Sequence, residues 1–255
     1  MKCGRVKRWY RIVAIGLIIF IIFFVAGADI VFSVQPTLAA LVCPRCFGFE
    51  QLYGRVYVDA AMPGPLRVQL ARAMREGETK VAGFYGELKA APEVLACATD
   101  ICWQRLGGGG AQGISYASVG IRLAPRGIDP VIVAHELSHI ELHERTGLAN
   151  FILGSIPAWF DEGLAVIVSD DPRFLLASTV SDRCRIEPTE DLPVGKMEWT
   201  RAAGTDQNLY AHAACRVLRW MKATGGNTAA LVLIQKVAEG VPFSEIYHVP
   251  AQGKS

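Results

Sequence analysis

Apolar and polar positions along the chain form patterns that predict several helices. Between Pro65 and Leu88, apolar residues recur every three or four positions, which predicts one long helix or two helices with a break near Glu76 and Gly77. Residues 130–146 begin with a proline, which suits the first turn of a helix, and are rich in apolar residues. They predict a largely buried helix. Further helices are expected at residues 157–168, 207–223 and 228–238.

Three shorter segments are typical of strands. β-branched and aromatic residues alternate with each other in residues 54–60, residues 114–124 alternate as in a strand, and VLACAT (residues 94–99) is a short run. The glycine-rich loop GGGGAQG (107–113) does not connect a strand to the start of a helix, so it is not a phosphate-binding loop. Residues 35–50 are expected to be a linker that leads into a small cysteine turn, and everything from about residue 43 onward is expected to form one α+β domain.

The first 34 residues have a different composition from the rest of the chain. Residues 1–11 carry five basic side chains and no acid, residues 12–28 carry no charge, and IVFSV continues the apolar run past Asp29. This order predicts a cytoplasmic tail (1–11), a transmembrane helix (12–34) and an exported domain (35–255), in a single-pass protein of the cell inner membrane. The small residues at 26–28 are typical of a cleavage site, so a cleaved signal peptide is the alternative.

The cysteines agree with export. An even number of cysteines outside the cytoplasm predicts disulfides, and CPRC is expected to hold a structural disulfide because no thioredoxin-like pattern surrounds it. A zinc knot formed by the first four exported cysteines is the weaker alternative, because their second pair is spaced too widely. The expected pairs are Cys43–Cys46, Cys97–Cys102 and Cys184–Cys215.

Charge narrows the choice of partners only slightly. The formal net charge is +2, and much of the positive charge lies in the first eleven residues. The chain has no basic stripe interleaved with aromatic residues, so nucleic acid is not an expected partner. The sequence gives no indication of an oligomeric state.

The segment VIVAHELSHIELHERTG (131–147) contains the motif HExxH, formed by His135, Glu136 and His139. Histidines four residues apart project from one face of a helix and can bind one metal ion together. The glutamate between them reaches a metal-bound water without binding the metal. The apolar flanks argue against an incidental motif on a surface helix.

A third ligand is needed, and His143 is a poor candidate. Three histidines at this spacing span about 12 Å of helix axis, which is too far for one tetrahedral ion. The metzincin pattern HExxHxxGxxH also fails, because Leu142 and Arg145 occupy its glycine and last histidine positions. We therefore expect His143 to lie behind the ligands or half-exposed on the last turn.

The better candidates lie in IPAWFDEGLAVIVS (156–169), where Asp161 and Glu162 begin an otherwise apolar helix. Burying acids in such a setting costs free energy unless they are paired or bound to metal. Twenty-two residues separate His139 from Glu162, enough for a loop and a returning helix. A carboxylate from this helix would complete a site of two histidines and one acid. The competing interpretation is an exposed acidic pair that caps the helix.

HELSH followed by PAWFDEGLA resembles the gluzincin zinc peptidases, in particular the bacterial peptidase-MA-like domains, over roughly residues 114–240. The resemblance implies a zincin-like fold, with a small mixed sheet plus helices, after the transmembrane helix. It also implies Zn²⁺ bound by His135, His139 and Glu162, with Glu136 as the general base.

The expected function is therefore hydrolysis of peptide bonds in peptide or protein substrates outside the cytoplasmic membrane. Tyr210 is the first candidate for stabilising the developing negative oxygen, and His212 is the second. Asp161 or Glu141 is expected to orient a ligand histidine. By analogy with the family, strand 114–124 is expected at the sheet edge that binds substrate backbone. The alternatives are a non-catalytic zinc-containing binding domain of the envelope, and a metal-dependent amidase acting on cell-wall crosslinks.

Overall fold

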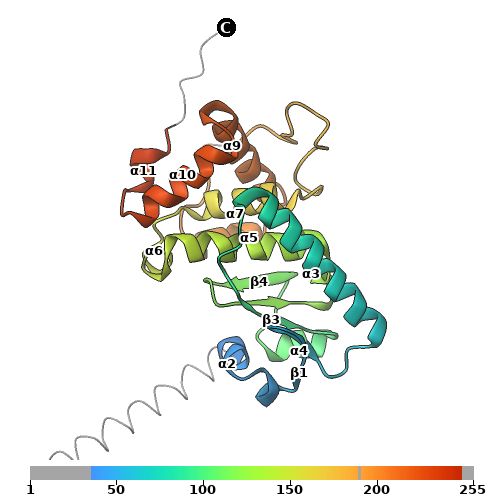
Figure 1. Ribbon diagram of the computed structural model, residues 1–255. Coiled ribbons are helices and arrows are strands. Elements are labelled where there is room, and N and C mark those ends of the chain that lie inside the picture. The colour runs from blue at the N-terminus through green and yellow to red at the C-terminus, as the bar shows by residue number, and fades with distance from the viewer. Residues whose placement is uncertain (1–35, 189–190, 249–255) are drawn as a thin grey trace, which may run out of the picture.

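The computed structural model describes residues 36–188 and 191–248, in which a five-stranded sheet is followed along the chain by a group of helices (Figure 1). The strand order is β1-β2-β3-β5-β4. The three inner strands run parallel to one another, while the two edge strands are antiparallel to their neighbours, so the sheet is mixed. The strands are β1 (Phe49–Tyr53), β2 (Val56–Asp59), β3 (Glu93–Ala96), β4 (Gly113–Tyr116) and β5 (Gly120–Leu123).

Ten α-helices accompany the sheet in the described residues. The helices before and between the strands are α2 (Pro36–Val42), α3 (Gly64–Tyr85) and α4 (Asp100–Arg105), with short 3-10 turns at Pro44–Phe47 and Pro125–Gly127. The helices after the sheet are α5 (Pro130–Thr146), α6 (Leu148–Leu153), α7 (Ala158–Ser169), α8 (Lys196–Ala203), α9 (Leu209–Thr224), α10 (Asn227–Ala238) and α11 (Phe243–Ile246). The predicted helices at 130–146, 157–168, 207–223 and 228–238 are confirmed by α5, α7, α9 and α10.

The two faces of the sheet are covered by different helices. On β3, Val94 and Ala96 belong to the main core, which they share with α3 and α5. Leu95, which points to the opposite face, packs in a smaller cluster with residues of α2 and α4. This alternation is the two-residue period of a strand buried on both faces.

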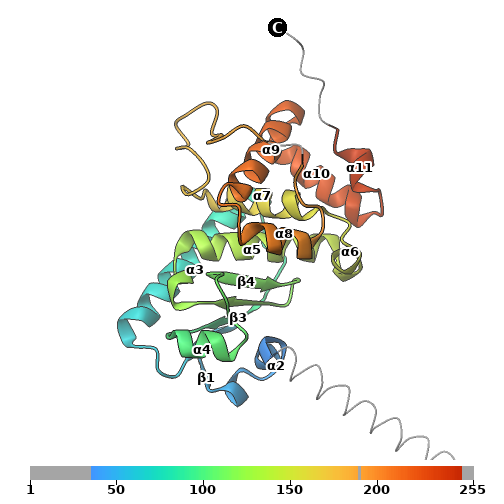
Figure 2. The same ribbon diagram turned by 180° about the vertical axis from the view of Figure 1, so that it is seen from behind.

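Helix α5 lies between the sheet and the C-terminal helices, as both views show (Figures 1 and 2). Its start is fixed by Asp129, whose carboxylate accepts a hydrogen bond from the backbone N–H of Val131 at 2.8 Å, and by Pro130 in the first turn. It ends at Gly147, whose φ of 85° favours glycine. The helix that carries HExxH is therefore held in the centre of the fold.

Helix α3 is continuous through Gly77, so the break that the sequence left open is absent. A Cβ atom at position 77 would lie 2.6 Å from Cγ1 of Val133 on α5. The glycine therefore allows α3 and α5 to approach each other closely.

Two predicted regions need correction. Residues 114–124 form a hairpin rather than one strand, because Ala117 adopts a left-handed φ of 48° and the backbone N–H of Val119 donates to the carbonyl oxygen of Tyr116. The segment 35–50 was expected to be a linker with a cysteine turn. The cysteine turn is confirmed by the 3-10 helix Pro44–Phe47 and the Cys43–Cys46 disulfide, but the described part of the segment also contains α2 and the start of β1, which packs through Phe49.

The fold prediction is confirmed as α+β with a small mixed sheet, but it is corrected on one point, because the described residues contain no transmembrane helix. Within residues 36–188 and 191–248, none of the helices is both long and apolar enough to cross a membrane. The predicted tail (1–11) and transmembrane segment (12–34) lie outside the described residues.

The predicted disulfides are confirmed. Cys43 is bonded to Cys46 and Cys97 to Cys102, which excludes the four-cysteine zinc knot. Cys184 is bonded to Cys215, which ties the loop before α8 to α9.

Candidate metal centre

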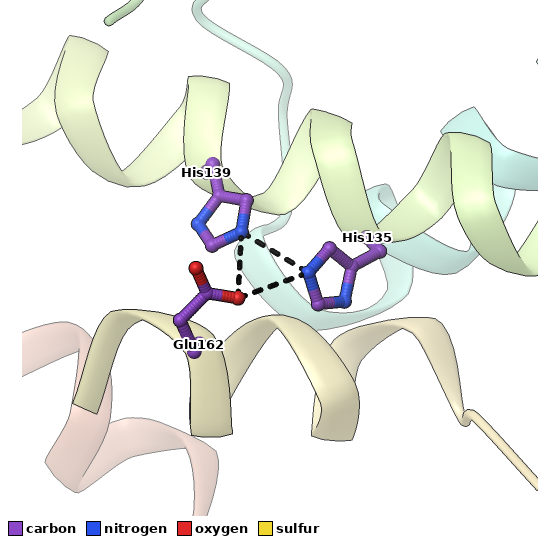
Figure 3. Close-up of side chains that lie close together, drawn as sticks. All are labelled: His135, His139 and Glu162. Carbon is purple, nitrogen blue, oxygen red and sulfur yellow. Dashed lines mark hydrogen bonds and ion pairs between the residues drawn. The ribbon is translucent and has the colours of Figure 1, made fainter. Parts of the chain in front are cut away.

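Three side chains from α5 and α7 converge on one point (Figure 3). His135 and His139 lie one turn apart on α5, and Glu162 faces them from the second turn of α7. The distance between the two Nε2 atoms is 3.2 Å, and Oε2 of Glu162 lies 3.3 Å from Nε2 of His135 and 3.5 Å from Nε2 of His139. Both histidines are buried and Glu162 is nearly so. The structure therefore brings together the three residues that the sequence proposed as ligands.

The spacing of these atoms fits a metal ion. Ligand atoms roughly 2.0–2.1 Å from a tetrahedral zinc ion stand about 3.3 Å apart. The three observed separations are 3.2, 3.3 and 3.5 Å. The donor set, two imidazole nitrogens and one carboxylate oxygen, is also chemically suitable for a divalent metal. These residues form a buried group able to hold a metal ion.

The electrostatics of the group favour a positive charge between its members. Burial alone would raise the pKa of Glu162, but His139 and His135 outweigh it and lower that pKa to about 2. Burial alone would lower the pKa of His139, but Asp161 and Glu162 outweigh it and raise the pKa well above its ordinary value. The ionised carboxylate and the imidazole therefore stabilise a positive charge between them, and a metal cation can supply that charge as well as a proton.

Glu136 is buried next to the group, on the same helix. Burial raises its pKa, and the neighbouring histidines offset only part of this effect. Its carboxylate packs against the backbone of Gly113 at the start of the edge strand β4, where a Cβ atom would lie 2.8 Å from Oε1 of Glu136. Gly113 therefore leaves the space that this carboxylate occupies. Sequence reasoning missed it, because nothing distinguishes it from the other glycines of its loop.

Asp161 lies behind the ligands and contacts two histidines. Its Oδ1 atom is 2.5 Å from Nδ1 of His139, and its Oδ2 atom is 3.1 Å from Nε2 of His143. Asp161 thus occupies the position expected of a residue that orients a ligand histidine. Glu141, the other candidate, instead accepts hydrogen bonds from the backbone N–H groups of residues 89 and 90 and pairs with Arg145.

Tyr210 reaches the group from α9, whereas His212 does not. The ring of Tyr210 lies 6.2 Å from that of His135, and its pKa is raised by burial and then by the charge of Glu162. His212 follows two residues later, about 200° around the helix, and its Nδ1 contacts the carbonyl oxygen of Glu187. Helix α9 can approach α7 because residue 163 is glycine: a Cβ atom at this position would lie only 2.6 Å from a backbone oxygen of α9.

Aromatic rings fix the position of Tyr210. Its ring is stacked on Phe174 at 5.1 Å between centroids and stands edge-on to Trp199 at 5.3 Å. Phe174 belongs to the loop that follows α7, which the Cys184–Cys215 disulfide ties to α9. Because these contacts join segments far apart in the sequence, no local pattern indicated them.

Comparison of the chain with protein-family models, with curated proteins and with solved structures gave no match.

Proposed function

We propose that the chain is a zinc-dependent peptidase of the gluzincin type that hydrolyses peptide bonds outside the cytoplasm. The observation that carries this proposal is the triangle of donor atoms from His135, His139 and Glu162, with the carboxylate of Glu136 buried beside it. Two histidines and one glutamate are the ligands of catalytic zinc sites that keep a position open for water or substrate. The three disulfides support an oxidising compartment.

In this proposal Glu136 is the general base. When bound, zinc supplies a Lewis acid that lowers the pKa of a water molecule and polarises the scissile carbonyl group. Glu136 takes the proton from that water during its attack and passes it to the leaving amine. A zinc site with a purely structural role needs no such base, so a carboxylate buried at this position favours an enzyme over a non-catalytic binding domain.

Tyr210 is proposed to donate a hydrogen bond from its hydroxyl to the oxygen on which negative charge develops. Burial and the nearby Glu162 keep this hydroxyl protonated, since both raise its pKa. Tyr210→Phe is expected to lower kcat by about 100-fold, the loss typical of removing one such donor. Bound zinc should stay unchanged, and an unaltered kcat would refute this role.

The central test compares purified full-length protein with its Glu136→Gln variant. Zinc content is measured by elemental mass spectrometry, and hydrolysis is followed on peptide libraries. Both proteins should contain one zinc ion per chain, and only the wild type should hydrolyse peptides. Glu144→Gln is the matched control, because Glu144 is an exposed residue of the same helix.

Two outcomes would contradict the proposal. Absence of zinc from the wild type would remove the metal centre, and equal hydrolysis by Glu136→Gln would remove the proposed base. Parallel assays on peptidoglycan fragments test the substrate class. Cleavage of these fragments without cleavage of peptides would reassign the enzyme to a cell-wall amide.

A further inference from the structure

A chain of polar contacts leads from the metal centre to His143, which takes no part in the triangle of donor atoms. Nε2 of His139 faces His135 and Glu162, while Nδ1 of the same ring lies 2.5 Å from Asp161. The other carboxylate oxygen of Asp161 lies 3.1 Å from Nε2 of His143. The imidazole of His143 is itself buried, and its ring makes a T-shaped contact with that of Phe151, with 4.7 Å between the ring centroids.

These three residues are close enough together to suggest a second metal site, but one distance argues against it. Two ligand atoms on a tetrahedral zinc ion stand about 3.3 Å apart. Nδ1 of His139 and Oδ1 of Asp161 are 2.5 Å apart, which is the separation of a short, charge-assisted hydrogen bond. A proton therefore lies between these atoms, and the group orients His139 rather than binding an ion.

The two candidate ligand histidines are held in different ways. Nδ1 of His135 is buried and has no hydrogen-bond partner among the described residues. Nδ1 of His139 has Asp161, and Asp161 in turn has His143. The orientation of the His139 ring is thus fixed by hydrogen bonding, and that of His135 by packing.

We propose that His143 is a positioning residue for the metal centre, holding Asp161 so that Asp161 fixes the His139 ring with Nε2 directed at the ion. Donation from Nε2–H of His143 to Oδ2 leaves Oδ1 to accept Nδ1–H of His139. A histidine that donates through Nδ1 has its lone pair on Nε2, the form that binds metal. The inference rests on the proposed function for the identity of the ion.

The first test is the affinity for zinc, measured on full-length protein by competition with a chelating indicator. His143→Leu removes the donor, and the dissociation constant for zinc should rise about tenfold. This is the lower end of the loss seen when a residue that supports a metal ligand is mutated. His143→Gln keeps an N–H donor and should recover most of the affinity. His248→Gln is the control, since His248 is exposed near the end of the described chain.

The second test separates this role from a general effect on folding. In metal-free protein the short hydrogen bond of His139 should give a proton resonance far downfield in the NMR spectrum, as short charge-assisted hydrogen bonds do. The signal should be lost or move upfield in His143→Leu and persist in His143→Gln.

The outcomes distinguish the inference from the proposed function. If the wild type binds no zinc, the proposed function fails, and the resonance in metal-free protein still decides whether His143 fixes His139. Unchanged zinc affinity and an unchanged resonance in His143→Leu would overturn the inference. If His143→Leu does not fold, His143→Gln decides: affinity and resonance near those of the wild type support the inference, and loss of both refutes it.

Discussion

The two faces of α5 both carry buried polar groups, but these are satisfied in different ways. On the face toward residues 85–90, Glu141 accepts backbone hydrogen bonds at 2.8 and 2.9 Å and an ion pair from Arg145 at 3.1 Å. On the face toward α7, the Nε2 atoms of His135 and His139 face each other and the carboxylate of Glu162 on α7. Nδ1 of His139 contacts Asp161, and Nδ1 of His135 has no partner in the described chain. A buried carboxylate with a full set of protein donors stabilises a fold. Buried imidazoles and a carboxylate left mainly to one another can be satisfied by a positive charge between them, either a proton or a metal ion.

The largest effect is expected from a change at Glu162. Glu162→Gln removes a charged ligand and should weaken zinc binding by more than roughly 100-fold. A loss of that size exceeds the one expected for a residue that only supports a zinc ligand. Zinc content after dialysis against a weak chelator measures this loss. Retention of zinc by the variant would show that the group does not hold the ion through Glu162.

A smaller change on the same face affects the base without touching a ligand. Gly113→Ala places a Cβ atom where the Glu136 carboxylate lies, and a displacement of about 1 Å should lower kcat/KM by about 100-fold. Zinc content should not change. Gly110→Ala is the control, because a Cβ at position 110 meets no atom within 4 Å. Equal activity of the two variants would show that Gly113 does not position Glu136.

A change on the other face of α5, at Glu141, should lower the stability of the fold without changing zinc affinity. Glu141→Gln weakens two charge-assisted hydrogen bonds and removes the ion pair of Arg145, which keeps its hydrogen bonds to the carbonyl oxygens of Tyr85 and Glu87, so the free energy of unfolding should fall by about 2 kcal/mol. Chemical denaturation of the zinc-free protein measures the change. Zinc affinity should remain that of the wild type, and a parallel loss of zinc would mean that the two faces are not independent.

The smallest effects are expected in α3, which packs against α5. Gly77→Ala should lower the free energy of unfolding by about 1 kcal/mol, because the new Cβ meets Val133. Gly83→Ala, in the same helix but with open space around it, should raise it by about 0.5–1 kcal/mol. Opposite signs in thermal unfolding support the close contact, and equal signs contradict it.

The sequence predicted the elements whose signals are local. Helix α5 was predicted at its observed boundaries because Pro130 and the apolar flanks mark it. The hairpin at residues 113–123 was missed, since its turn depends on the backbone of Ala117 and the surrounding alternation suits one strand equally well. The sequence left open whether α3 is continuous, because Gly77 serves a contact with a distant helix.

The same distinction applies to the site. Spacing and the cost of burying acids pointed to the helix that carries Asp161 and Glu162, the resemblance implied Glu162, and the structure brings Glu162 to His135 and His139. The rotation between neighbouring helical positions separates Tyr210 from His212, but only the packing of α9 shows which of them faces the group. The burial of His143 depends on Asp161 and on Phe151 of α6, neither of which its own helix specifies.

The central place of α5 also sets the order in which the site is assembled during synthesis. The sheet, α3 and α5 are encoded before residue 147, so the N-terminal part can pack while α7 and α9 are still being made. A nascent chain that ends before Ala158 carries two of the three candidate ligands and none of the aromatic rings around Tyr210. The three candidate ligands can therefore come together only after α7 has been made, and the aromatic contacts of Tyr210 form later still, when α8 and α9 have followed.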